Sequence, residues 1–371
     1  MPTKVCYIIS NIDKALAFEW IAASIDKPTI ELHFILLNPS DSQLESFLRS
    51  EGIAVTRITY LSKFDVPVAI WKVLWYLKRH KIKVVHCHLF DACIVGMTAA
   101  WLCRTPKRIY TRHYSTNHHV YYPKAVKYDR YINALATHIV AISEKVKNVL
   151  IELEKVEPAK IHVIHHGFDL KAFSSIDVDK RTQMKLKYGI NNQYPVIGVI
   201  SRYVELKGLQ YVIPAFAEIK KTYPDAFLVL ANCNGDYKPQ IQESLQRLLD
   251  GTSYREIIFE NDLPTLYSLM DIFIHVPIDE TIEAFGQTYI EALAANVPSV
   301  FTLSGVANEF IENQKNALVV DYKNTEQIVE AMKRILTDDH LRESLVNNGQ
   351  QSIQAKFSLK LYIHKLIQLY V

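Results

Sequence analysis

Short hydrophobic runs alternate with longer amphipathic stretches through the first half of the chain, which predicts strands alternating with helices. The predicted strands span residues 5–9, 31–37, 54–58, 83–88, 108–111, 138–142 and 161–165. The predicted helices span 13–25, 41–50, 67–80, 91–103, 124–136 and 144–154, the last of them capped by Ser143. Strands joined through helices form parallel sheets, so the pattern indicates an α/β fold.

The same pattern restarts after a turn-rich stretch at 166–173 and a polar segment that ends at Tyr194. The second series of predicted strands spans 195–201, 226–231, 256–259, 271–276, 299–302 and 317–320. The predicted helices span 208–222, 239–249, 264–270, 286–295, 307–313 and 325–337, after which the chain is helical to its end. We therefore expect two Rossmann-like domains, residues 1–170 and 171–371, with the last helix packed back on the first.

Composition and charge narrow the class of protein. The chain has 371 residues, and its content of 49% hydrophobic and 22% charged residues excludes a disordered or fibrous protein. A net charge of +3, spread over both halves, gives no reason to expect nucleic acid as a partner. The five cysteines are odd in number and form no CxxC pair, as in proteins of the reducing cytosol.

Two further features concern membranes. The sequence opens on a strand-like run without the pattern of a signal peptide, and no stretch of 18 residues is apolar enough to span a bilayer, so we expect a cytoplasmic protein. Residues 71–83 mix aromatic and cationic side chains, which is typical of helices on a membrane surface. Core-facing helices with lysines extended into solvent have the same pattern, so surface association with the inner face of the membrane stays an alternative.

The most informative segment begins at Glu283 and reads EAFGQTYIEALAANVP. A helix is predicted to start just after the turn at Gly286, and its first N–H groups, with the helix dipole, form a natural site for an anion such as a diphosphate. Glu283 precedes this turn, and Glu291 lies a turn or more into the helix. Ionised carboxylates accept strong hydrogen bonds from hydroxyl groups, so the pair is suited to a sugar.

Two other segments follow predicted strands at the edge where open α/β sheets bind ligands. Arg202 and Lys207 lie in SRYVELKGL, directly after the first strand of the second half, and are spaced to converge on one point. His113 lies in RHYST at the end of another strand, next to Arg112, and a histidine there can donate a hydrogen bond to a sugar or a phosphate.

These segments resemble the motifs of the retaining glycosyltransferases of family 4, whose fold is two Rossmann-like domains facing across a cleft. The stretch from Glu283 is similar to the EGFG-x4-EA-x-A-x-G-x-P signature, with Ala284 and Asn296 in place of two glycines. The resemblance implies that Glu283 lies by the transferred hexose and that Glu291 holds the ribose hydroxyls. It also implies donor contacts from the backbone of the turn, which comprises Phe285, Gly286 and Gln287.

The other segments resemble further elements of the same family. Arg202 and Lys207 match a G-R-x4-K-G element whose cations neutralise the departing diphosphate, and His113 matches a T-x-H segment whose histidine reaches the transferred sugar. The stretch 304–320 resembles a G-G-x-x-E segment, which places Glu309 on the base or ribose side of the donor.

Several positions depart from the family or carry structural roles. In HHGFD, similar to an N-G-V-D element, we assign Gly167 to a turn with positive φ and His166 to structure. The loop after the first strand lacks the usual glycine pair, so the acceptor side is assigned to four residues of the first domain: Ser10, Asn11, His88 and Arg112. Strand alternation places His86 and His88 on one face and Cys87 on the other, and we predict no metal site.

The sequence thus predicts a retaining glycosyltransferase that moves a hexose-type sugar from a UDP- or GDP-sugar to a glycan or lipid-linked acceptor in cell-surface polysaccharide assembly, without a cofactor. Glu283 and His113 are the predicted catalytic residues. Because fold alone does not determine the reaction, a nucleotide-sugar epimerase or a phosphorylase is the alternative enzyme. A non-catalytic subunit that binds a sugar nucleotide is the alternative of another class.

Overall fold

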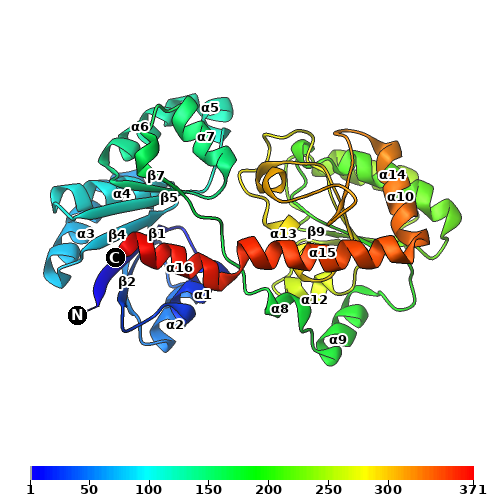
Figure 1. Cartoon of the computed structure of the whole chain (residues 1–371), viewed down its shortest axis with the longest axis horizontal. Helices are drawn as coiled ribbons and strands as arrows, with labels where there is room; N and C mark the ends of the chain where they lie inside the picture. Colours follow the sequence, from blue (N-terminus) through cyan, green and yellow to red (C-terminus); the bar gives the residue numbers. More distant parts are fainter. Residues whose placement is uncertain (1) are drawn as a thin grey trace. The chain divides into compact units, whose positions relative to one another are not determined.

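The computed structural model describes residues 2–371, and the chain forms two compact units (Figure 1). The first unit comprises the chain up to Phe168 together with Phe357–Val371, and the second comprises Asp169–Lys356. Each unit holds one sheet in which every strand pairs in parallel with its neighbours. No helix of residues 2–371 is long and apolar enough to cross a bilayer.

The sheet of the first unit has seven strands in the order β3-β2-β1-β4-β5-β6-β7. Its strands are β1 (Thr3–Ser10), β2 (Ile30–Asn38), β3 (Ala54–Thr59), β4 (Val84–His88), β5 (Lys107–Arg112), β6 (His138–Ala141) and β7 (Ile161–Val163). β1, β2 and β4 are buried almost end to end, because helices cover both faces of the sheet. The order reverses between β1 and β4, and ligands bind at such a point, beside the carboxyl ends of the strands.

Helices connect these strands as the amphipathic stretches predict. They are α1 (Leu16–Ser24), α2 (Gln43–Ser50), α3 (Val66–His80), α4 (Phe90–Leu102), α5 (Asn117–Tyr121), α6 (Val126–Leu135) and α7 (Glu144–Glu152), with α16 (Leu359–Tyr370) added from the end of the chain. The Ser143 hydroxyl accepts a hydrogen bond from the Val146 N–H (3.2 Å), which confirms the predicted cap of α7. α16 contributes Leu366 and Tyr370 to the core of the first unit.

The second unit holds a six-stranded sheet in the order β10-β9-β8-β11-β12-β13, which reverses between β8 and β11. Its strands are β8 (Val196–Ile200), β9 (Phe227–Ala231), β10 (Tyr254–Ile257), β11 (Ile272–His275), β12 (Ser299–Phe301) and β13 (Leu318–Val319). Its helices are α8 (Lys171–Ser174), α9 (Val178–Tyr188), α10 (Leu209–Thr222), α11 (Lys238–Leu248), α12 (Leu263–Tyr267), α13 (Gln287–Ala294), α14 (Thr325–Thr337) and α15 (Asp339–Phe357).

Three sequence predictions are corrected. The polar segment before Tyr194 contains α9, which has few buried residues but begins at the cap Asp177 and ends at Gly189 with φ +70°. The helix predicted at 307–313 is a short 3₁₀ turn, Gly305–Glu309. Gly167 does not have a positive φ; it is needed because a Cβ there would lie 2.4 Å from the Cβ of Tyr362 on α16.

Candidate active site

The loops after β8 and β11 bring the central charged pair of the second unit together. Lys207 ends a 3₁₀ turn (Glu205–Lys207) and forms an ion pair with Glu283, whose side chain is 13% exposed. Gly208, with φ +77°, allows this approach, because a Cβ there would lie 2.0 Å from the carbonyl oxygen of Val276. Glycine after Lys207 therefore allows the loop after β8 to pack closely against the end of β11.

Two further side chains hold the Glu283 carboxylate and its backbone. His275, the last residue of β11, lies with Nε2 3.0 Å from Glu283 Oε1. Its Nδ1 is buried and has no hydrogen-bond partner among residues 2–371, which favours the tautomer in which Nε2–H donates to Glu283. The Glu283 N–H donates to the Ser304 hydroxyl (3.0 Å). We call Lys207, His275, Glu283 and Ser304 the charged cluster.

The pKa of Glu283 reflects this environment. Burial by itself raises the pKa of the carboxyl group, but the hydrogen bond from His275 and the charge of Lys207 outweigh burial and lower the pKa to about 2. Glu283 is therefore a carboxylate throughout the neutral pH range. The carboxylate can accept hydrogen bonds from hydroxyl groups, and the neighbouring cation can pair with a phosphate.

The start of α13 adjoins the charged cluster. Gly286, the N-cap of α13, has φ +90°, and a Cβ built on it would lie 2.6 Å from the Tyr289 ring and 3.5 Å from Glu283 Cγ. The Val306 N–H donates to the Phe285 carbonyl (2.9 Å), which fixes the turn against the 3₁₀ turn Gly305–Glu309. The end of a helix that carries partial positive charge thus lies beside Lys207 and Glu283.

Glu291 occupies a more apolar place in α13. It lies just over one turn into the helix, as predicted, and is 8% exposed. Burial raises the pKa of its carboxyl group to about 7, and the hydrogen bond donated by the Tyr267 hydroxyl (3.0 Å) offsets part of that effect. A carboxyl group that titrates near neutrality can both accept and donate hydrogen bonds.

The remaining residues predicted to contact the donor lie after β8, at the start of α13 and after β12. Arg202 follows β8 by two residues and is exposed, and among residues 2–371 its guanidinium forms no hydrogen bond or ion pair with Glu283. Gln287 is exposed at the first position of α13. Glu309 lines a pocket of about 390 Å³ together with Lys315 and residues of α15.

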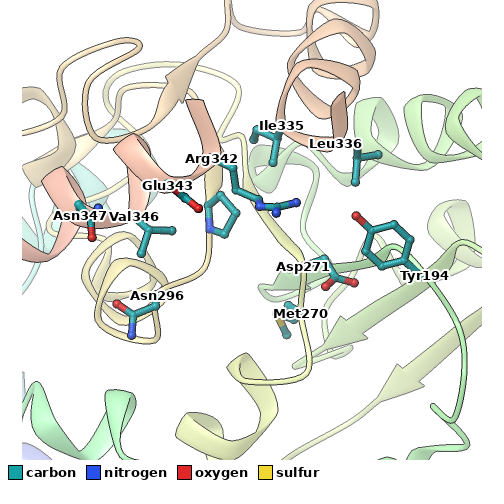
Figure 2. A pocket seen from close by; sticks show the side chains of 11 residues that line it. Tyr194, Met270, Asp271, Asn296, Ile335, Leu336, Arg342, Glu343, Val346 and Asn347 are labelled. Carbon is teal, nitrogen blue, oxygen red and sulfur yellow. The ribbon is translucent and has the colours of Figure 1, made fainter. Parts of the chain in front are cut away.

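A pocket larger than the one at Glu309 lies at the edge of the same sheet that is opposite to Lys207 and Glu283. Tyr194, Asp271 and Pro298, which line it, precede β8, β11 and β12, so it opens at the amino ends of the strands (Figure 2). Its volume is about 470 Å³. Because Lys207 and Glu283 lie beyond the carboxyl ends of β8 and β11, this pocket is not part of the candidate site.

Three of the four residues predicted on the acceptor side of the first unit are buried. Ser10, His88 and Arg112 are each 1% exposed. The Ser10 hydroxyl accepts a hydrogen bond from the Ala92 N–H (3.2 Å) and so joins β1 to α4. Asn11 is exposed, but its N–H donates to the Leu37 carbonyl (3.0 Å) and is not available to a ligand.

The Arg112 guanidinium is held by two buried carboxylates. Its Nη1 lies 3.2 Å from Asp129 Oδ1, and its Nη2 forms an ion pair with Glu154. The Asn133 side-chain amide donates to Glu154 (2.7 Å), and His118 Nδ1 lies 2.8 Å from Asp129. The Arg112 side chain thus joins α6 and the segment just after α7 to the end of β5.

His113 is partly buried beside a group of histidines of the first unit. Its Nε2 lies 3.1 Å from His88 Nδ1, and its ring stacks on His166 at a centroid distance of 5.5 Å. His86 contacts the hydroxyl groups of Thr111 (2.8 Å) and of another buried side chain, Tyr370 of α16 (2.6 Å). We call His86, His88, His113 and His166 the histidine group.

Burial lowers every pKa in the histidine group, to about 3 for His86 and His166, to about 4 for His113, and well below the usual value for His88. Below pH 6.5 the unfolded chain binds protons that the folded unit takes up only near pH 4. The free energy of unfolding should therefore decrease as the pH is lowered through this window, by at most about 1.4 kcal/mol per pH unit for each of these histidines. Urea unfolding measured between pH 7.5 and 4.5 checks this dependence.

A matched pair of variants assigns the effect to the histidine group. His166→Asn removes one half-buried ring of the histidine group and should flatten the pH dependence, whereas His340→Asn changes an exposed histidine of α15 and should leave it unchanged. Equal pH dependence in the His166→Asn variant and the unchanged protein would contradict the assignment.

Sequence reasoning missed three side chains that complete these clusters: His275, Asp129 and Glu154. His275 is the single polar side chain in the apolar run that ends β11, and a polar residue at the carboxyl end of a buried strand is the signal that could have found it. Asp129 and Glu154 gave no local signal, because they lie 17 and 42 residues beyond Arg112.

Two models of glycosyltransferase families match the sequence of this chain. The model for glycosyl transferases group 1 matches residues 180–352, and the model for Glycosyltransferase Family 4 matches residues 22–172. The capsular polysaccharide biosynthesis glycosyltransferase CapM of Staphylococcus aureus is 26% identical over 84% of this chain and 82% of its own length. The alpha-monoglucosyldiacylglycerol synthase of Acholeplasma laidlawii is 26% identical over 87% of this chain and 84% of its own length.

Solved structures share the fold. The structure of Anabaena Alr3699/HepE in complex with UDP and glucose superimposes with a TM-score of 0.83 over 99% of this chain and 98% of that chain, at 18% identity. The two matched families and this likeness identify the arrangement of two Rossmann-like units as the GT-B fold.

Proposed function

Because the chain is a GT-B glycosyltransferase of the family 4 type, we propose that it transfers a hexose from a UDP- or GDP-sugar to a glycan or lipid-linked acceptor with retention of configuration. The ion pair between Lys207 and Glu283, next to the start of α13, is the observation that carries the proposal. A leaving diphosphate needs a cation, and a hexose needs a carboxylate for its hydroxyls; both groups are present at one point.

The second unit binds the donor in this proposal. Lys207 exchanges its contact with Glu283 for the diphosphate, and Arg202, which is exposed and close in sequence, adds a second cation. The N–H groups at Gly286 and Gln287 meet the same phosphates, because the first N–H groups of a helix have no partner within it. Glu291 holds the ribose hydroxyls, with Glu309 toward the base or ribose side.

In this proposal the reacting sugar lies beside Glu283, and His113 donates a hydrogen bond to it. His113 has a pKa of about 4, since burial disfavours its charged form, so it contacts the sugar as a neutral hydrogen-bond donor. The acceptor binds to the first unit. The CapM relative is named for capsular polysaccharide biosynthesis, which supports a role in cell-surface polysaccharide assembly at the inner face of the membrane.

The experiment that tests the donor is a comparison of nucleotides. UDP or GDP at about 100 times its dissociation constant should stabilise the folded protein by about 2.7 kcal/mol, measured as a rise in Tm. The corresponding sugar nucleotides are then incubated with glycan and lipid acceptors, and free nucleoside diphosphate is measured. Protein that neither nucleotide stabilises, and that releases no diphosphate from any sugar nucleotide, would contradict the proposal.

The same incubations separate the alternatives. An epimerase converts one sugar nucleotide to another without an acceptor, whereas a transferase releases diphosphate in proportion to the acceptor consumed. A non-catalytic subunit binds the nucleotide without turnover, and Glu283→Gln leaves that binding unchanged. Proton NMR of the new glycosidic bond measures the retention of configuration.

A further inference from the structure

His275 is a buried histidine at the end of a strand whose other side chains are apolar. β11 reads IFIH, and its first three side chains are fully buried. His275 itself is 3% exposed, and its Nδ1 has no hydrogen-bond partner among residues 2–371. A buried ring nitrogen without a partner costs stability, and an apolar side chain would avoid that cost. Packing alone therefore does not account for a histidine at this position.

Among residues 2–371, the His275 ring forms its single hydrogen bond with Glu283. Nε2 of the ring lies 3.0 Å from Glu283 Oε1. The Tyr289 ring meets the His275 ring edge to face at a centroid distance of 4.7 Å. The Tyr289 hydroxyl donates to the Thr302 carbonyl (2.9 Å), and the Thr302 N–H donates to the His275 carbonyl (3.2 Å). β11 and α13 together therefore fix the direction in which Nε2–H points.

The Glu283 carboxylate receives two donors on the same oxygen. Lys207 and His275 both contact Oε1, whereas Oε2 has no hydrogen bond or ion pair with another group of residues 2–371. Burial lowers the pKa of His275 in spite of its hydrogen bond with Glu283, so the ring is neutral at neutral pH. In the proposed transfer Lys207 turns to the diphosphate, and His275 is then the donor that still holds the carboxylate. A neutral donor can do so without attracting the phosphates.

We propose that His275 is a positioning residue for sugar transfer: its Nε2–H holds the Glu283 carboxylate beside the reacting sugar after Lys207 has moved to the diphosphate. This inference rests on the proposed function. Holding the carboxylate through Oε1 leaves Oε2 to accept a hydrogen bond from a sugar hydroxyl.

The charges around Glu283 give this role a measurable consequence. Burial raises the pKa of Glu283, and the hydrogen bond from His275 is the largest of the effects that lower it to about 2. The other titratable side chains that face this pair among residues 2–371 are Lys207 and Tyr289. Loss of the His275 donor should therefore raise the pKa of Glu283, most of all in the donor complex, where Lys207 contacts the diphosphate.

Two substitutions separate the hydrogen bond from the shape of the ring. His275→Phe keeps an aromatic ring but removes Nε2–H, and it should lower kcat about 100-fold, the loss expected when a reacting group is misplaced by about 1 Å. His275→Gln places an amide N–H near the position of Nε2 and should recover most of the lost activity. In His275→Phe the fall of kcat on acidification should also begin at a higher pH, because Glu283 is then protonated more readily. Steady-state release of nucleoside diphosphate across the pH range measures both effects.

His162→Phe is the matched control. His162 lies in β7 of the first unit, and its Nε2 is also buried without a partner among residues 2–371. The control thus loses a similar ring nitrogen away from the charged cluster and should leave kcat and its pH dependence unchanged. Thermal unfolding identifies any variant that does not fold. A purely structural role of His275 would lower kcat equally at every pH and would not be rescued by glutamine.

NMR of protein with isotope-labelled histidine nitrogens gives a readout that does not depend on activity. The signal of His275, identified by its absence from His275→Gln, should be that of a neutral ring with its proton on Nε2, and it should shift in Glu283→Gln. A proton on Nδ1, or a His275→Phe variant with the kcat and pH profile of the active, unchanged chain, would overturn this inference but not the proposed function. An unchanged chain that releases no diphosphate would overturn both.

Discussion

Replacing Lys207 with methionine should lower kcat for sugar transfer about 100-fold to 1,000-fold, the loss typical when one preorganised group that stabilises developing charge is removed. Lys207 is placed for this role by Gly208 and by its ion pair with Glu283. Methionine keeps most of the length of the side chain but has no charge for the departing diphosphate. The change should act on kcat more than on KM, because negative charge on the diphosphate grows as the bond to the sugar breaks.

Steady-state release of nucleoside diphosphate measures this effect, and Lys221→Met is the matched control. Lys221 pairs with Glu218 on the surface of α10 and is 72% exposed, so its replacement should leave kcat and Tm unchanged. A Lys207→Met variant that is folded and retains more than about a tenth of the activity would remove Lys207 from the proposed mechanism.

The strands were the most predictable part of the fold. Strands buried on both faces form continuous apolar runs, and the runs at 195–201 and 226–231 coincide with β8 and β9 to within a residue at each end. α9 was harder to predict. It buries only Met184 and Tyr188, so its sequence has little of the helical spacing of apolar residues. Its start and end signals, Asp177 and Gly189, were nevertheless present in the sequence.

The candidate site was predictable where a local motif specifies it. The segment from Glu283 to Glu291 contains its own turn, helix start and carboxylates, so residue spacing alone describes it. Burial of Arg112 was not predictable in this way, because its two carboxylate partners lie far along the chain, in α6 and in the turn after α7. Contacts made across the fold depend on packing and register, which a single sequence does not specify locally.

Replacing Arg112 with methionine should lower the free energy of unfolding of the first unit by about 3–5 kcal/mol, because it leaves two buried carboxylates without their shared cation. Asp129 and Glu154 are both fully buried, and hydrogen bonds from Tyr114 and Asn133 orient them without neutralising them. The loss should exceed that of a surface pair several-fold. Urea unfolding followed by circular dichroism measures it.

A second variant tests whether the unpaired carboxylates cause this loss of stability, because it removes their charges as well. Arg112→Met combined with Asp129→Asn and Glu154→Gln should recover part of the lost stability, because no unpaired buried charge is then left. Lys147→Met, which breaks the surface ion pair with Glu144 on α7 of the same unit, should cost less than about 1 kcal/mol. If the triple variant is less stable than Arg112→Met alone, shape and hydrogen bonding, rather than charge, account for the stability of this buried network.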